Sequence, residues 1–224
     1  MMGVLYIVAT PIGNLEDITL RALRVLSEVD TIFCEDTRVT GKLLHHHGIS
    51  AKMQSLNART EDHKLNLVVG LLSEGQDIAY VSDAGTPGIS DPGVRLVSAV
   101  KEQDIEVVAI PGPSAVTTAL SIAGVPTNKF TFLGFLPQKK GRQTALKDLS
   151  ESEHTIVLYE STHRILKLLK ELQDYVSINR HITLARELTK MHEEILQGSA
   201  EELLKILESN PQKQKGEFVV IVSS

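Results

Sequence analysis

A loop of unusual composition, residues 82–93 (SDAGTPGISDPG), is the stretch best suited to bind a ligand. Its twelve residues include three Gly, two Pro and two Asp, so it forms neither a helix nor a strand. Gly allows the backbone to approach a ligand closely, and Pro stiffens the turns. The carboxylate of Asp83 offers acceptors to hydroxyl or ammonium groups. An ordinary turn needs only about two to five residues of these types, and we therefore predict a ligand-binding loop.

Other residue types that often carry chemistry point elsewhere. Adjacent histidines such as His45, His46 and His47 point in different directions on a helix, and no carboxylate follows at the spacing of a metal ligand. They indicate a solvated helix end, and we expect no metal site. The single cysteine, Cys34, lies in the strand-like run TIFC and indicates a buried, inert thiol. No P-loop and no GxGxxG motif is present, which argues against a P-loop NTPase and a dinucleotide-binding Rossmann domain.

The first half of the chain supplies a framework for the loop. Short apolar runs at 5–9, 31–34, 78–81 and 107–110 alternate with segments of helical periodicity, including 18–29, 39 to about 46, 61–73 and 94–100. Asp17 or Thr19 is suited to cap the first of these helices. This alternation predicts a mostly parallel sheet with helices on both faces. Ligands bind at the carboxyl ends of strands in such sheets, and the loop 82–93 directly follows a strand.

The pattern changes after residues 111–115 (PGPSA), where two prolines end a strand stiffly and Ser114 is placed to cap a helix. Strand-like runs FTFLGFL, TIVLYE, HITLARE, EEILQG and GEFVVIV follow, with helices at about 143–149, 163–174 and 200–208. Some of these strands follow one another directly, which predicts a mixed sheet. We therefore expect an α/β fold with two α/β domains, residues 1–112 and 113–224.

Bulk properties limit the partners. The chain has 224 residues, 42% of them hydrophobic, and a net charge of −5, which argues against coating nucleic acid through a global positive field but allows a local basic patch. No apolar run approaches the roughly 20 residues that cross a bilayer, and the N-terminus lacks a basic leader region. We expect a cytoplasmic protein.

Seven motifs in this order, VATPIGN, EDTR, SDAGTPGISDPG, IPGPSA, GFLP, YESTHR and RELTK, resemble the tetrapyrrole methylase-like family of S-adenosylmethionine-dependent methyltransferases. The resemblance runs from Leu5 to about Val222. It implies two α/β domains with S-adenosyl-L-methionine in the cleft between them, and a homodimer. Within the family the chain is similar to the branch that methylates the 2′-hydroxyl of a cytidine near the decoding centre of small-subunit (16S) ribosomal RNA. Longer members carry a small helical segment after the second domain, so we expect RNA contacts of that segment to be absent or supplied otherwise.

The resemblance also implies which residues contact the cofactor. Loop acceptors such as Asp83 suit the ammonium and ribose hydroxyls, and Ile12 and Ala115 suit the adenine ring. The full set is Pro11, Ile12, Asp83, Ala84, Thr86, Ser114 and Ala115, with Tyr159, Ala185 and Glu217 from the second domain.

Basic residues in or beside the motif loops would give an acidic protein a basic rim suited to RNA phosphates. Any one of them is also compatible with ordinary solvated surface charge. The predicted RNA contacts are Arg38, Arg59, Lys139, Lys140, Arg164, Arg186 and Lys190.

Methyl transfer to a ribose hydroxyl benefits from a general base, because the hydroxyl is a poor nucleophile. The candidate catalytic carboxylates are Glu35, Asp36, Glu160 and Glu187. Each could instead orient a neighbouring arginine, and the sequence does not choose between the two roles.

Two other functions fit the same motifs. A methyltransferase of the same fold would act on a tetrapyrrole, or on a modified protein side chain. A catalytically silent RNA-binding module would assist ribosome assembly, although such a module has no need of a stiff cofactor loop.

Overall fold

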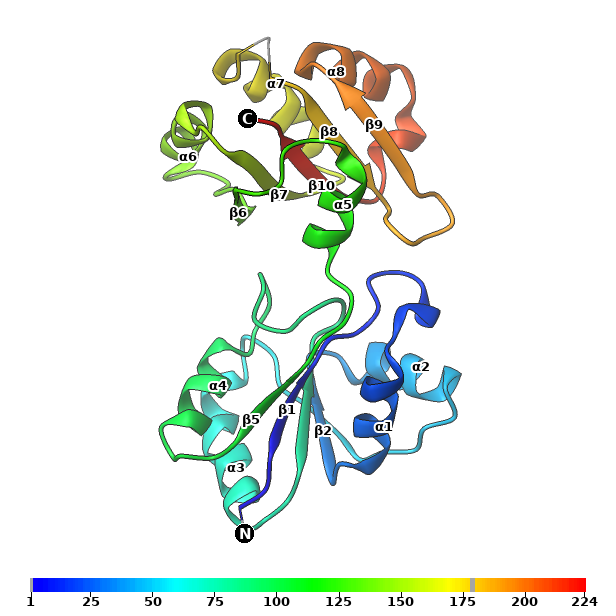
Figure 1. The fold of residues 1–224 in the computed structure, drawn as a ribbon, viewed down its shortest axis with the longest axis vertical. Helices are drawn as coiled ribbons and strands as arrows, with labels where there is room; N and C mark the ends of the chain where they lie inside the picture. Colours follow the sequence, from blue (N-terminus) through cyan, green and yellow to red (C-terminus); the bar gives the residue numbers. More distant parts are fainter. Residues whose placement is uncertain (1, 178–179) are drawn as a thin grey trace. The chain divides into compact units, whose positions relative to one another are not determined.

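The computed structural model describes residues 2–177 and 180–224. The chain forms two compact units, Met1–Ser114 and Ala115–Ser224, each with its own sheet (Figure 1). The division falls two residues after Gly112, where the sequence placed a domain boundary.

The N-terminal unit contains a five-stranded, fully parallel sheet in the order β3-β2-β4-β1-β5. Its strands are β1 (Leu5–Val8), β2 (Thr31–Cys34), β3 (Met53–Ser55), β4 (Ile78–Val81) and β5 (Val107–Ile110). The strand β4 is central, and all of its residues are buried. Its continuous apolar run IAYV follows from burial on both faces, as is usual in parallel sheets.

Helices cover both faces of this sheet (Figure 1). One face packs against α1 (Leu20–Glu28) and α2 (Thr37–His46), and the other against α3 (Glu61–Ser73) and α4 (Val94–Lys101). Along β4, Ala79 and Val81 belong to the first of these cores, and Ile78 and Tyr80 to the second. The expected mostly parallel sheet with helices on both faces is confirmed. Of the two candidate caps for α1, Thr19 is the one used, because its Oγ1 accepts the Ala22 N–H at 3.1 Å.

The C-terminal unit contains a mixed sheet, as the sequence predicted. Its strand order is β6-β7-β10-β8-β9. β6 and β7 pair in parallel, and the remaining neighbours pair antiparallel. The unit begins with α5 (Ala115–Ala123), directly after Ser114. The remaining elements are β6 (Phe130–Phe135), α6 (Arg142–Glu151), β7 (Thr155–Ser161), α7 (Ile165–Tyr175), β8 (Ile182–Arg186), β9 (Glu194–Gly198), α8 (Ala200–Ser209) and β10 (Glu217–Val222).

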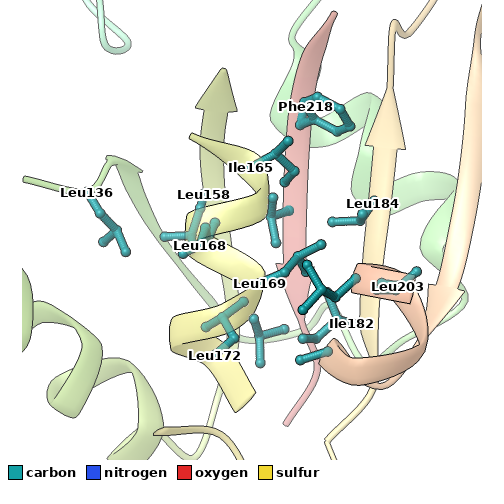
Figure 2. Packing of buried hydrophobic residues seen from close by; sticks show 14 of the residues in the cluster. Leu136, Leu158, Ile165, Leu168, Leu169, Leu172, Ile182, Leu184, Leu203 and Phe218 are labelled. Atoms are coloured by element: carbon teal, nitrogen blue, oxygen red, sulfur yellow. The ribbon is translucent and has the colours of Figure 1, made fainter. Parts of the chain in front are cut away.

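A leucine-rich core fixes the helices on one face of the second sheet (Figure 2). Leu168, Leu169 and Leu172 of α7 pack there with Leu203 of α8, over strand residues such as Leu184. The helix α8 starts with a capping box, in which Ser199 and Glu202 satisfy each other's backbone N–H groups. The opposite face of the sheet is contacted by α5 at β10 and β8. This leaves the loops at one end of each sheet to carry function.

Candidate cofactor and substrate site

The carboxyl end of the N-terminal sheet holds the first loop against the central one. Thr10 and Gly85 form an antiparallel bridge beyond the ends of β1 and β4. The hydroxyl of Thr10 also donates to the Ser82 carbonyl at 3.2 Å, and that of Thr86 donates to the Pro113 carbonyl at 3.3 Å. Three of the predicted motif loops therefore share one rigid edge.

Carboxylates gather at this edge. The Asp83 N–H donates to Oε2 of Glu35 at 3.3 Å, and the Asp36 N–H donates to Oδ1 of Asp83 at 3.1 Å. Burial, with the charges of Asp91 and Asp83 adding to it, raises the pKa of Glu35. Burial also raises the pKa of Asp83 and, helped by the charge of Asp83, raises that of Asp91 to about 6. Negative charge confined in this way favours a cationic group of a ligand.

Asp91 is a member of this carboxylate group that no predicted contact includes. Asp91 lies in the same loop as Asp83, eight residues later in the chain. The turn that brings Asp91 back to the end of the strand could not be predicted from the sequence.

A pocket lies beside this carboxylate group. Pro11, Leu15, Val39 and Leu43 supply apolar walls, and Asp83 lies at its polar side. Apolar walls with a few polar groups suit a small ligand with a flat ring and charged ends. The structure thus brings Pro11 and Asp83 together as predicted and adds Val39 and Leu43, which carried no motif signal. The complete lining is Thr10, Pro11, Leu15, Val39, Thr40, Leu43, Ser82 and Asp83.

The other predicted cofactor residues of this unit flank the pocket without lining it. Ala84 is exposed next to Asp83, and Thr86 is half-buried. Ile12 is half-buried, and its Cγ2 lies 3.5 Å from where a Cβ on Gly85 would stand. Ser114 and Ala115 are half-buried at the division between the two units.

Glu61, which no motif contains, anchors the far end of the central loop. It is buried at the start of α3, and its Oε1 accepts the N–H groups of Gly93 at 3.3 Å and Leu96 at 3.2 Å. These N–H groups belong to the first turn of α4, which has no cap from its own segment. Glu61 therefore fixes where the loop ends and α4 begins.

At the corresponding end of the C-terminal sheet, one row of residues crosses the strands. Phe135 pairs with Tyr159, Tyr159 with Val219, and Val219 with Ala185. Tyr159 is half-buried and contacts two phenylalanine rings edge-on. Ala185 is fully buried in the structure, and its contact with the cofactor stays a prediction.

Glu187, Lys190 and Glu217 form one ionic group. Lys190 Nζ lies 3.0 Å from Oε1 of Glu187 and 2.9 Å from Oε2 of Glu217. Burial alone would raise the pKa of Glu187, but the Glu217 N–H and the Lys190 ammonium more than offset it, and the pKa is lowered. A carboxylate with a lowered pKa is a weak base, and Lys190 is already paired with two carboxylates.

Two of the predicted RNA contacts turn out to hold the fold together. Arg186 is only 8% exposed and donates to the backbone carbonyls of Lys215, His192 and Gln212. Arg164 donates to the Leu136 carbonyl at 2.5 Å and pairs with Glu160. Both RNA contacts stay predictions; in the structure these guanidinium groups are bound to protein acceptors, and the side chain of Arg164 is 21% exposed.

Glu160, another of the candidate bases, lies beside Arg164. It is buried, and its Oε1 accepts the Ser161 N–H at 2.8 Å and lies 3.3 Å from Arg164 Nε. Glu160 orients Arg164, and the Glu160 side chain itself is not exposed to solvent.

Four of the other predicted RNA contacts are exposed. Arg59, Lys139 and Lys140 lie in surface loops. Arg38 is exposed and pairs with Asp36. That pairing, with the Arg38 N–H, lowers the pKa of Asp36 to about 2.

The metal and thiol expectations concern residues outside this site. Among the residues that the structure describes, no group of three or more His, Cys, Asp or Glu is placed to hold a metal ion. His45 and His46 are exposed at the end of α2, but His47 is half-buried and its Nε2 lies 3.0 Å from the Leu15 carbonyl. Cys34 is buried, and burial raises the pKa of its thiol. No described helix combines the length and the apolar character needed to cross a bilayer.

The fold and the loop-borne site define a two-unit α/β enzyme, and comparison with known proteins identifies the class. The sequence model of the tetrapyrrole (corrin/porphyrin) methylases matches residues 4–204. Cobalt precorrin-4 methyltransferase CbiF has a similar structure, with a TM-score of 0.73 and 18% identity over 98% of this chain and 94% of that one. Uroporphyrin-III C-methyltransferase from Thermus thermophilus gives a TM-score of 0.67 and 20% identity, over 99% of this chain and 94% of that one.

Closer similarity is found in sequence. Ribosomal RNA small subunit methyltransferase I of Escherichia coli O157:H7 is 50% identical over 98% of this chain and 77% of its own length. The protein of the same name from Thermotoga maritima is 45% identical over 99% of both chains. The chain therefore belongs to the tetrapyrrole methylase family. It is a methyltransferase whose methyl donor is S-adenosyl-L-methionine.

Proposed function

We propose that this protein transfers the methyl group of S-adenosylmethionine to the 2′-hydroxyl of a cytidine in 16S ribosomal RNA, near the decoding centre. The observation that carries the proposal is the identity of 45–50% to ribosomal RNA small subunit methyltransferases I along almost the whole chain. Identity to the tetrapyrrole enzymes of the same fold is only 18–20%. We further expect a homodimer that works in the cytoplasm.

The N-terminal site suits the cofactor. Its carboxylates would attract the ammonium and sulfonium charges, and Asp83 has acceptors for a hydroxyl or ammonium donor. The apolar walls of Pro11, Val39 and Leu43 would hold the adenine ring. The remaining proposed contacts are Ile12, Ala84, Thr86, Ser114 and Ala115, with Tyr159 and Glu217 from the second unit.

Methyl transfer is an in-line displacement, so the chain's main task is to hold the acceptor oxygen, the methyl carbon and the sulfur in line. S-adenosylmethionine supplies an activated methyl group on a cationic sulfur. Among the four candidate carboxylates, Glu35 is the best suited to take up the hydroxyl proton. Its pKa is raised by burial, whereas Asp36 and Glu187 are tied to cations and Glu160 is buried.

The test is incorporation of radiolabelled methyl groups by the purified protein, with 30S subunits, free 16S RNA and uroporphyrinogen offered separately. We expect label in the RNA, at a cytidine whose 3′ linkage resists alkali because its 2′-hydroxyl is blocked. Label in the tetrapyrrole alone would replace the proposal with the first alternative. RNA binding without any transfer would favour the silent assembly module.

A further inference from the structure

An aromatic patch lies exposed on the second sheet. Phe130 and Phe132 of β6 pair with Thr155 and Val157 of β7, and after a register shift (a β-bulge) Phe135 pairs with Tyr159. The alternate residues of β7, Ile156 and Leu158, belong to the leucine-rich core. The three phenylalanines therefore lie on the opposite face of the sheet. The helix α5 contacts this face over β10 and β8, and Phe130 and Phe135 remain 42% and 52% exposed.

The ring of Phe135 is held in place although it is exposed. Its centroid lies 5.6 Å from that of Tyr159, which in turn lies 4.9 Å from that of Phe132, both in edge-on geometry. Such packing restricts the ring without covering its outer side.

Two arginines fix the backbone directly after Phe135. Arg164 donates to the Leu136 carbonyl at 2.5 Å, and Arg142 donates to the Pro137 carbonyl at 3.0 Å. Both arginines are anchored by carboxylates, Glu160 and Glu171. An exposed aromatic ring on a backbone held this firmly is pre-organised to receive a flat ligand.

Positive charge follows Phe135 closely in the chain. Lys139 and Lys140 are exposed in the loop between β6 and α6, four and five residues after Phe135. In the described part of the chain, neither lysine forms an ion pair. A flat apolar surface beside free cations is complementary to a nucleotide, which carries a stacking base and an anionic phosphate.

We propose that Phe135 stacks on the base of the acceptor nucleotide, and that Lys139 and Lys140 contact phosphates beside it. This inference rests on the proposed function and deepens it. The position of the ring suits the role, because Phe135 is the neighbour of Tyr159 in the row that crosses the sheet. Adjacent strands are about 4.8 Å apart, so a base on Phe135 lies one strand away from the proposed cofactor contact.

The test compares Phe135→Leu, Phe135→Tyr and Phe130→Leu, with 30S subunits as substrate. Leucine keeps an apolar side chain but removes the aromatic face, and tyrosine keeps that face. Phe130 is the matched control, because it lies on the same strand and face, with similar exposure, at the other end. We expect F135L to weaken RNA binding and raise KM about 5- to 150-fold, the range typical for loss of one base–aromatic stack. F135Y and F130L should stay within about twofold of wild type on the same measure.

Affinity for S-adenosylmethionine and the melting temperature are measured on the same variants, and both should be unchanged. Wild-type RNA kinetics in F135L would overturn the stacking role. Equal loss in F130L and F135L, or a change of oligomeric mass in F135L, would also overturn it and indicate a contact between copies of the chain. If the wild-type protein itself does not methylate RNA, the proposed function fails, which is a distinct result.

Discussion

Thr10 and Gly85 exchange two backbone hydrogen bonds, from the Thr10 N–H to the Gly85 carbonyl at 2.9 Å and from the Gly85 N–H to the Thr10 carbonyl at 3.0 Å. The bridge joins the chain after β1 to the chain after β4, two strands that already pair in the sheet. Asp83 and Ala84 therefore sit in a short excursion between the strand end at Ser82 and a fixed point at Gly85. Ligand-binding groups mounted in this way are held by the sheet, not by a flexible loop.

Substitution of Gly85 should damage the cofactor site through backbone strain. Gly85 has φ +75°, and the nearest atom to an added Cβ is 3.5 Å away, so conformation and not space is the constraint. The left-handed conformation costs a non-glycine residue about 1–2 kcal/mol, and more with a branched Cβ. We expect Gly85→Val to weaken S-adenosylmethionine binding at least about 10-fold by calorimetry.

Gly48→Ala is the control for Gly85. Gly48 has a similar φ of +68° with no atom within 4 Å of an added Cβ, and it lies in the turn after α2. The substitution Gly48→Ala should lower the stability of the protein without changing its affinity for the cofactor. Equal losses of affinity in the two variants would refute the special role of Gly85.

Glu61→Ala should free the first turn of α4. The substitution leaves two buried N–H groups without their acceptor, at a cost of about 1–3 kcal/mol each. Glu61→Gln keeps an acceptor oxygen and should recover most of the loss. Urea unfolding of both, beside Asp62→Ala at the exposed neighbouring position, measures the effect. Similar unfolding free energies for the Ala and Gln variants would show that the hydrogen bonds are unimportant.

Arg186→Ala and Arg38→Ala should differ in kind. Loss of Arg186 leaves three partly buried backbone carbonyls without these donors, and we expect unfolding to become easier by about 1–3 kcal/mol. Arg38 is 86% exposed, so its loss should leave stability nearly unchanged.

If Arg38 contacts RNA, the variant Arg38→Ala should also reduce the salt dependence of binding by about one phosphate contact. Measuring melting temperature and the salt slope on both variants separates the two roles. A shallower slope for Arg186→Ala with an intact fold would restore its RNA contact.

The different environments of Arg186 and Arg38 could not be predicted from the sequence. Both lie in motifs at the ends of strands, and both were assigned to one basic rim. Arg186 is buried because segments around His192, Gln212 and Lys215 fold over it, and no local pattern encodes that contact. The same holds for Glu61, whose partner Gly93 is 32 residues away in the chain.

Features set by local pattern were predictable. The helix expected at 61–73 matches α3, and the alternation of apolar runs with amphipathic segments led to the parallel sheet. The loops of the site were recognisable because Gly, Pro and Asp are concentrated in them. Burial, by contrast, depends on tertiary packing, and the burial of Ala185 and Glu160 was not predicted.

Methylation should not need a metal ion. The leaving group of the reaction is a neutral thioether formed from a cationic sulfur, so no Lewis acid is required to stabilise it. Activity on free 16S RNA should therefore persist in EDTA; free RNA is used because 30S subunits themselves require Mg²⁺. A loss of activity in EDTA that one particular metal ion restores would contradict this.

The last prediction concerns Asp91 and pH. In the folded protein its pKa is raised to about 6 from an ordinary value of 3.8, first through burial and then through the charge of Asp83. The folded state thus binds the proton more tightly than the unfolded chain, and the stability linked to Asp91 is lost as the pH rises from about 4 to about 6. Because Asp91 is partly exposed, solvent screens part of this effect, and we expect the free energy of unfolding to fall by about 1–2 kcal/mol.

Asp91→Asn cannot titrate, so this variant should gain stability over wild type as the pH rises through that window. Glu35 and Asp83 titrate in both proteins, but each interacts with the charge of Asp91, so the difference reports Asp91 together with its effect on these two neighbours. Unfolding free energies are measured at pH 4.5 and about pH 7.5, on either side of the folded pKa. Between the two pH values, the unfolding free energy of the wild type should fall relative to that of the variant. A constant difference in unfolding free energy would show that the folded state does not disfavour the charged form of Asp91.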